Sequence, residues 1–226
     1  NRSIFANFAE KNIEFEIGEH SEKVFDSNLW VLSPGVPSDL DFILKAKEMG
    51  ILVISEIEFA SWYTKKPIIG ITGSNGKTTT VNLIQKILKS SHLDPVLAGN
   101  VGYAFSRAIL SDQNDEPKER VYILELSSFQ LENIVDFKPM ISVILNISPD
   151  HLDRHKNMDS YINAKLNIFK NQDEKDYLIY NSSDSILSKK CQKALCKKIE
   201  FGLSKSSRSL LEKNGSKVYD LSLIHI

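Results

Sequence analysis

Short apolar runs alternate along the chain with segments whose apolar positions recur at helical spacing. The runs that predict strands lie at 29–33, 51–54, 68–72, 96–98, 121–126, 141–147 and 177–180. Predicted helices follow them at 38–49, 56–63, up to about residue 90, 103–110, 127–135 and 160–169. Strands without polar alternation, separated by helices, are typical of a parallel sheet that is buried on both faces. We therefore expect an α/β fold.

A linker interrupts this pattern at residues 64–67, where Lys65 and Lys66 precede a proline. A Lys-Lys-Pro segment is exposed and ends helices, and a new apolar run begins directly after it. We therefore expect two domains, one formed by residues 1–64 and the other by residues 65–226.

Composition excludes several classes of protein. The 226 residues carry 28 basic and 29 acidic side chains, so the chain has no excess of positive charge for sequence-independent binding of nucleic acid. The longest apolar stretch, about 140–147, is far shorter than the roughly 18–20 residues of a membrane helix, and residues 1–22 contain no apolar signal core. Cys191 and Cys196 lie in a Lys-rich segment that looks helical, and we expect free thiols in a reducing cytoplasm.

The segment 70–78 carries the clearest chemical signal, because glycines precede a Lys-Thr pair between a predicted strand and a predicted helix. In such a loop the backbone amides surround phosphate, a lysine neutralises the β- and γ-phosphates, and a hydroxyl binds Mg²⁺. A strict Walker A motif would place glycine at position 71, where this chain has Ile71. The alternative is a glycine-rich turn followed by a surface lysine. The predicted nucleotide-binding residues are Gly73, Ser74, Asn75, Gly76, Lys77, Thr78 and Thr79.

Guanine-nucleotide switch proteins share this kind of loop but also need an Asp-x-x-Gly motif and an Asn-Lys-x-Asp motif. Neither motif occurs in the sequence. The sequence therefore argues against a GTPase switch.

Residues 72–79 resemble the nucleotide loop of the Mur ligases, the ATP-dependent enzymes that form amide bonds in peptidoglycan assembly. Four further segments agree with that family in order and spacing, at 33–37, 98–102, 125–132 and 146–154. The match extends from about residue 2 to residue 218. Segments 33–37 and 125–132 are most similar to the family member that adds D-glutamate.

The resemblance implies a partial Rossmann-like N-terminal domain at 1–64, which binds a UDP substrate, and a P-loop-type central ATPase domain with a mainly parallel sheet at 65–226. In the family a third, C-terminal domain binds the amino acid. This chain starts without Met, and its last residues, 221–226, complete no helix or strand. We therefore expect a fragment that lacks the extreme N-terminus and the C-terminal domain, and that has no ligase turnover by itself.

The reaction that the resemblance implies activates the carboxylate of UDP-N-acetylmuramoyl-L-alanine with ATP, giving an acyl phosphate that the amine of D-glutamate attacks. The implied cofactors are ATP, two Mg²⁺ ions and carbon dioxide held as a lysine carbamate. The expected partners are these two substrates, without nucleic acid or membrane insertion, and the expected state is a cytoplasmic monomer. The alternatives are another Mur-type or folylpolyglutamate-type ligase, and a non-catalytic nucleotide-binding module.

The predicted catalytic residues are Lys77, Glu125, His151 and Lys165. Glu125 ends an apolar strand, so it needs a partner, either a magnesium ion shared with Thr78 or a buried ion pair. The resemblance implies that His151 is a second metal ligand and that Lys165, as a carbamate, ligates Mg²⁺. A surface histidine and a surface lysine are the alternatives.

Three residues are predicted to contact the substrate: Asn100, Ser127 and Gln130. Asn100 lies between glycines, where it could reach a pyrophosphate or simply form a turn. Ser127 and Gln130 have the spacing of a helix capping box, so capping, substrate contact or both can account for them. Arg2 falls where the family binds uridine.

Overall fold

The computed structural model describes residues 8, 10–112, 119–150 and 152–202. Arg2 and His151 lie outside the described residues. The chain divides into two compact units, the first formed by Asn1–Trp30 and Asp39–Val53, the second by Val31–Ser38 and Ile54–Ile226. We describe each unit by itself.

The smaller unit contains the 3₁₀ helix η1 (Glu22–Asp26) and the helix α2 (Asp41–Glu48). Strands β1 (Leu29–Leu32) and β2 (Leu52–Ser55) begin within it and form a two-stranded sheet. Gly50 follows the helix with a φ of 80°, which is the left-handed conformation that glycine adopts after a helix end. The ring of Trp30 contacts the rings of Phe25 and Phe42.

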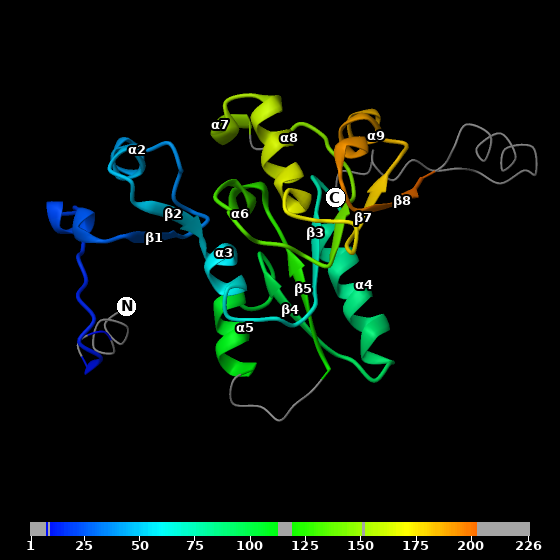
Figure 1. Ribbon diagram of the computed structural model, residues 1–226, viewed down its shortest axis with the longest axis horizontal. Helices are drawn as coiled ribbons and strands as arrows, with labels where there is room; N and C mark the ends of the chain where they lie inside the picture. The colour runs from blue at the N-terminus through cyan, green and yellow to red at the C-terminus, as the bar shows by residue number, and fades with distance from the viewer. Residues whose placement is uncertain (1–7, 9, 113–118, 151, 203–226) are drawn as a thin grey trace, which may run out of the picture. The chain divides into compact units, whose positions relative to one another are not determined.

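The larger unit is built on a parallel sheet of six strands in the order β4-β5-β3-β6-β7-β8 (Figure 1). The strands are β3 (Ile68–Thr72), β4 (Asp94–Gly99), β5 (Arg120–Glu125), β6 (Ile141–Ile144), β7 (Tyr177–Asn181) and β8 (Lys197–Phe201). The helices are α3 (Glu56–Ser61), α4 (Lys77–Lys89), α5 (Phe105–Asp112), α6 (Ser128–Glu132), α7 (Leu152–His155), α8 (Met158–Leu166) and α9 (Ser185–Lys190), with 3₁₀ turns η2 (Asn167–Phe169) and η3 (Cys191–Lys193).

Alternate residues of the central strands belong to two separate hydrophobic clusters. Ile69, Ile71 and Ile123 pack with Val81 of α4, whereas Tyr122 and neighbouring strand residues pack with α3, α5, α6, α8 and α9. Because successive side chains of a strand point to opposite faces, these clusters cover the two faces of the sheet, with α4 on one side (Figure 1). The predicted α/β architecture is confirmed.

The carboxyl ends of the central strands meet at one edge of the sheet. Register pairs Glu125 with both Gly99 of β4 and Ile71 of β3, and pairs Thr72 with Ile144 of β6. Ligand-binding groups collect at this edge in parallel α/β sheets, so the segments that follow β3, β4, β5 and β6 lie together there.

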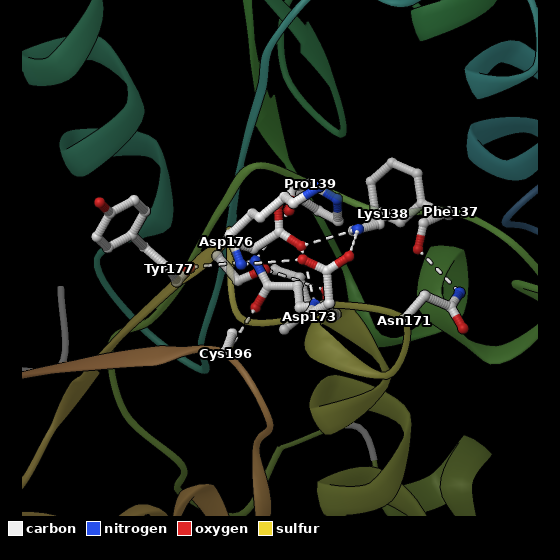
Figure 2. Close-up of polar contacts among 12 residues, drawn as sticks. Phe137, Lys138, Pro139, Asn171, Asp173, Asp176, Tyr177 and Cys196 are labelled. Carbon is white, nitrogen blue, oxygen red and sulfur yellow. Dashed lines mark hydrogen bonds and ion pairs between the residues drawn. The ribbon is translucent and has the colours of Figure 1, made fainter.

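A polar cluster closes the opposite end of strands β6 and β7 (Figure 2). The buried Gln172 amide donates to the carbonyls of Pro139, at 2.9 Å, and Tyr177, at 3.1 Å, and its oxygen accepts from Cys196 Sγ. Both the nitrogen and the oxygen of this buried amide therefore have hydrogen-bond partners, as burial requires.

Ion pairs extend this cluster on its outer side. Lys138 pairs with both Asp173 and Asp176, and the amide of Asn171 donates to the carbonyls of Val135 and Phe137 (Figure 2). The cluster binds the loop before β6 to the loop before β7, at the end of the sheet away from the candidate site.

Two features differ from the sequence predictions. The segment from Cys191 to Cys196 looks helical in sequence but contains only the turn η3, and strand β8 follows it unpredicted. Helix α3 belongs to the larger unit and packs on α5, whereas the sequence predicted a boundary after Thr64. Both cysteines are buried and free, as expected. In the described part of the chain, no helix is long and apolar enough to cross a membrane.

Candidate nucleotide and metal site

The loop between β3 and α4 contains two glycines with positive φ and ends at the start of a helix. Gly73 and Gly76 have φ values of 154° and 81°, which residues with a Cβ adopt only under strain. Gly76 is the N-cap of α4, so the helix begins directly at Lys77. The first amide groups and the positive end of the helix therefore face this loop. The predicted strand-loop-helix arrangement is confirmed, and its binding of nucleotide stays a prediction.

A second segment, which follows β6, supports this loop from the side. The side-chain amide of Asn146 accepts from Asn75 N at 2.9 Å and donates to Asn75 O at 3.1 Å. Ser74 Oγ lies 2.8 Å from the hydroxyl of Tyr161 and 2.9 Å from the carbonyl oxygen of Ser148. These reciprocal bonds hold the loop before any ligand binds, which lowers the entropy cost of binding.

Two lysines converge on one carbonyl of the loop. Lys77 Nζ donates to Gly73 O at 2.8 Å, and Lys165 Nζ donates to the same oxygen at 2.9 Å. Only 2% of Lys165 is exposed. Burial, and next the charge of Lys77, lower the pKa of Lys165 to about 7, while Asp150 opposes the shift. Burial also lowers the pKa of Lys77.

Glu125 is buried at the end of β5 and is held by two side chains. Its Oε2 accepts from Thr78 Oγ1 at 2.8 Å, and its Oε1 accepts from the Asn100 amide at 2.9 Å. A carboxylate and a threonine hydroxyl beside a phosphate-binding loop are the oxygen ligands that Mg²⁺ takes together with substrate phosphates. The donor set therefore fits one magnesium ion, and the structure brings Thr78 and Glu125 together as the sequence predicted.

Gly99 explains how Asn100 reaches this carboxylate. Gly99 has a φ of 99°, and a Cβ added to it would lie 2.4 Å from Glu125 O. Because the chain turns so closely around β5, Asn100 N also donates to Glu125 O, at 2.8 Å. The sequence predicted a pyrophosphate contact or a turn for Asn100. It could not predict this orienting contact, which depends on the pairing of β4 with β5.

Ser127 and Gln130 form the capping box that their spacing predicted. Gln130 N donates to Ser127 Oγ at 3.3 Å, and Ser127 N donates to Gln130 Oε1 at 3.0 Å. The capping interpretation is confirmed. Contact of either residue with substrate stays a prediction.

The remaining predicted site residues are placed as follows. Thr79 is exposed in the first turn of α4. His151 lies outside the described residues, so its predicted role in binding metal stays a prediction. Among the described residues, no group of three His, Cys, Asp or Glu side chains gathers around one point.

Sequence reasoning gave no role to Arg154 and His155, which end helix α7. His155 is 5% exposed and contacts three residues of α6. The sequence held one signal for these contacts. Phe129 is a large aromatic residue in a predicted helix, and such a side chain needs packing partners.

The parallel sheet, the glycine loop at a helix start and the buried carboxylate at a strand end together define a P-loop-type nucleotide-binding domain. A family model described as the Mur ligase middle domain matches residues 71–224. The chain is therefore a member of the Mur ligase family. This confirms the resemblance of the five sequence motifs.

Curated relatives agree with this assignment. The chain is 44% identical to the UDP-N-acetylmuramoylalanine--D-glutamate ligase of Christiangramia forsetii over 202 residues, which cover 84% of this chain and 44% of the relative. It is also 44% identical to the ligase of that name from Clostridioides difficile, over 86% of this chain and 42% of the relative. The chain thus spans less than half the length of these two relatives.

Solved structures of the family share the fold. MurF ligase from Thermotoga maritima in complex with ADP superposes with a TM-score of 0.52 at 21% identity, covering 72% of this chain and 44% of that chain. A structure of UDP-N-acetylmuramoyl-L-alanyl-D-glutamate--2,6-diaminopimelate ligase superposes with a TM-score of 0.53 at 20% identity, covering 79% and 46%. The predicted fold class is confirmed by both.

Proposed function

We propose that the protein carrying this chain is an ATP-dependent ligase that adds D-glutamate to UDP-N-acetylmuramoyl-L-alanine in peptidoglycan synthesis. One observation carries the proposal. A phosphate-binding loop, a Thr78–Glu125 pair and a buried second lysine, Lys165, meet at one edge of the sheet, in a chain 44% identical to ligases of that name. The MurF relative was solved with ADP, which supports ATP as the nucleotide.

The loop residues have direct roles in phosphoryl transfer. Backbone amides of 73–76 would bind the phosphates, and Lys77 would turn toward the β- and γ-phosphates and neutralise their charge. Thr78 and Glu125 would hold Mg²⁺, which neutralises phosphate charge when it is bound. Asn100 keeps the Glu125 carboxylate oriented toward Thr78.

Lys165 is suited to become a carbamate. An amine with a pKa near 7 is neutral in about half of the molecules at neutral pH, and only the neutral amine is nucleophilic. Its nitrogen would form a bond to the carbon of CO₂ and release a proton to solvent. The side chain would then offer carboxylate-type oxygens and, with His151, would hold a second Mg²⁺.

The ligation takes two steps. In the first, a carboxylate oxygen of UDP-N-acetylmuramoyl-L-alanine attacks the γ-phosphorus of ATP and ADP leaves. In the second, the amine of D-glutamate attacks the carbonyl carbon, phosphate leaves, and the amine nitrogen releases a proton to solvent. The second step requires the amine to be held close to the acyl phosphate. Residues 1–64 would carry part of the UDP-substrate site, and Ser127 and Gln130 would contact the substrate. The amino-acid site belongs to a further C-terminal domain of a cytoplasmic monomer.

The test is phosphate release by the protein expressed from its whole reading frame, with ATP, Mg²⁺ and UDP-N-acetylmuramoyl-L-alanine. The amino acids compared are D-glutamate, L-glutamate, L-alanine, L-lysine and meso-diaminopimelate. We expect release with D-glutamate only, loss of release in Lys77→Ala, and full release in the matched control Lys86→Ala, an exposed lysine of the same helix.

Other outcomes separate the alternatives. Release with a different amino acid would keep the Mur-type ligase and change its substrate. Silence with every amino acid, together with intact binding of ATP, would contradict the proposal and favour a non-catalytic nucleotide-binding module.

A further inference from the structure

His155 lies at the centre of a buried polar and aromatic cluster that the proposed mechanism does not use. Its Nε2 lies 2.8 Å from Ser128 Oγ, and its Nδ1 lies 3.3 Å from Glu132 Oε1. The roles of the two ring nitrogens depend on the tautomer: with a proton on Nδ1, that nitrogen faces the Glu132 carboxylate and Nε2 accepts from the Ser128 hydroxyl.

Helix α6 also contacts the segment 34–38. Glu132 Oε2 accepts from Ser38 Oγ at 2.7 Å. The guanidinium of Arg154 lies 3.9 Å from the ring centroid of Phe129 and donates to Pro34 O at 2.8 Å. This segment is therefore joined to α6 directly by one hydrogen bond and indirectly by a cation–π contact.

A second arm of the cluster leads to the nucleotide loop. The His155 ring stacks on Phe129 at 5.0 Å and meets the ring of Tyr161 edge-on at 5.3 Å. The Tyr161 hydroxyl lies 2.8 Å from Ser74 Oγ, within the loop that we propose binds phosphate. His155 thus contacts Ser128 and Glu132 through its nitrogens, and it contacts the aromatic residues Phe129 and Tyr161 through its ring.

We propose that His155 is a positioning residue, which sets helix α6 and the segment 34–38 against the nucleotide loop. This inference rests on the proposed function, in which α6 carries the substrate-side residues Ser127 and Gln130. Transfer of the γ-phosphoryl group requires the substrate carboxylate and ATP to be aligned, and small displacements are costly. The polar contacts of His155 and its stack on Phe129 hold the UDP-substrate side, and the edge contact of the ring with Tyr161 holds the ATP side.

Two substitutions separate the polar contacts from the ring contacts in the protein expressed from its whole reading frame. His155→Phe keeps a ring against Phe129 and Tyr161 but removes both polar contacts. Since one such hydrogen bond is worth about a factor of ten, we expect the KM for UDP-N-acetylmuramoyl-L-alanine to rise about tenfold while the KM for ATP changes less than about twofold. His155→Ala removes the ring as well, and both KM values rise.

The control is His92→Phe, because His92 is exposed and pairs only at the surface with Glu119. Ser38→Ala tests the far end of the polar contacts without disturbing a buried ring, and it decides the question if the His155 variants do not fold. We expect it to raise the KM for the UDP substrate by a smaller factor and to leave the KM for ATP unchanged.

The outcomes are distinguishable. The positioning role alone would be overturned if the wild type is active and His155→Phe and Ser38→Ala leave both KM values unchanged. It would also be overturned if these variants raise the KM for ATP as much as the KM for the UDP substrate. A wild type without activity toward UDP-N-acetylmuramoyl-L-alanine would overturn the proposed function, and this inference with it.

Discussion

At the scale of single residues, the candidate site depends on charged groups that are buried next to their partners. Lys165, Lys77 and Glu125 are close to one another around a loop whose carbonyl Gly73 O accepts from both lysines. Burying an amine disfavours its charged form. Burial of the charged lysine therefore costs folding free energy, and this cost can be measured through the lowered pKa of the amine.

The first prediction concerns the pH dependence of stability. The folded pKa of Lys165, about 7, lies below its unfolded value, so the unfolded state binds more protons between these values and stability rises with pH there. The contribution has a slope of up to about 1.4 kcal/mol per pH unit. Lys165→Met should stabilise the protein most at pH 6 and progressively less toward pH 10, measured by urea unfolding in CO₂-free buffer.

The control for this experiment is Lys86→Met, which changes an exposed lysine and should leave the pH dependence as it is. An identical slope in wild type and Lys165→Met would contradict the low pKa.

The second prediction concerns Gly99, whose turn brings Asn100 to the Glu125 carboxylate. A methyl group there would meet Glu125 O at 2.4 Å. Gly99→Ala should therefore cost more than the roughly 1–3 kcal/mol of backbone strain alone and should also abolish phosphate release. Gly50→Ala is the matched control, since Gly50 has a similar φ of 80° with nothing within 4 Å. Equal losses of unfolding free energy in the two variants would refute the steric argument.

At the scale of elements, strands were easier to predict than the contacts between them. The apolar runs of β3 and β5 are continuous because both faces of each strand are buried, and sequence shows this directly. Strand β8 was missed because its residues are all exposed and include two lysines. The sequence predicted a boundary after Thr64, and the packing of α3 on α5 could not be predicted because α5 is distant in sequence.

The third prediction concerns the contact that fixes α3 within the larger unit. Glu58 is fully buried and accepts from the backbone amides of Val135, Asp136 and Phe137 and from the Trp62 indole. Glu58→Ala would leave these donors without the carboxylate, so we expect a loss of at least about 3 kcal/mol of unfolding free energy. The comparison is Glu48→Ala on the exposed side of α2. A loss below about 1 kcal/mol for Glu58→Ala would show that water replaces the carboxylate.

At the scale of the whole molecule, the fold class, the nucleotide loop and the Thr78–Glu125 pair could all be predicted from sequence. Motifs identify such residues because phosphate and Mg²⁺ demand particular groups at fixed spacing. The roles of Asn100 and His155 could not be predicted, because they arise where strands and helices distant in sequence come together. Their partners, Glu125 and Glu132, are visible only in the folded chain.

In the proposed reaction, this site activates a carboxylate through phosphoryl transfer. The most direct test uses UDP-N-acetylmuramoyl-L-alanine with ¹⁸O in both oxygens of its terminal carboxylate, together with ATP, Mg²⁺, D-glutamate and the protein expressed from its whole reading frame. An acyl phosphate leaves one carboxylate oxygen on the released phosphate when the amine attacks. We predict that mass spectrometry finds one ¹⁸O atom in that phosphate for each amide formed. Unlabelled phosphate would contradict the account.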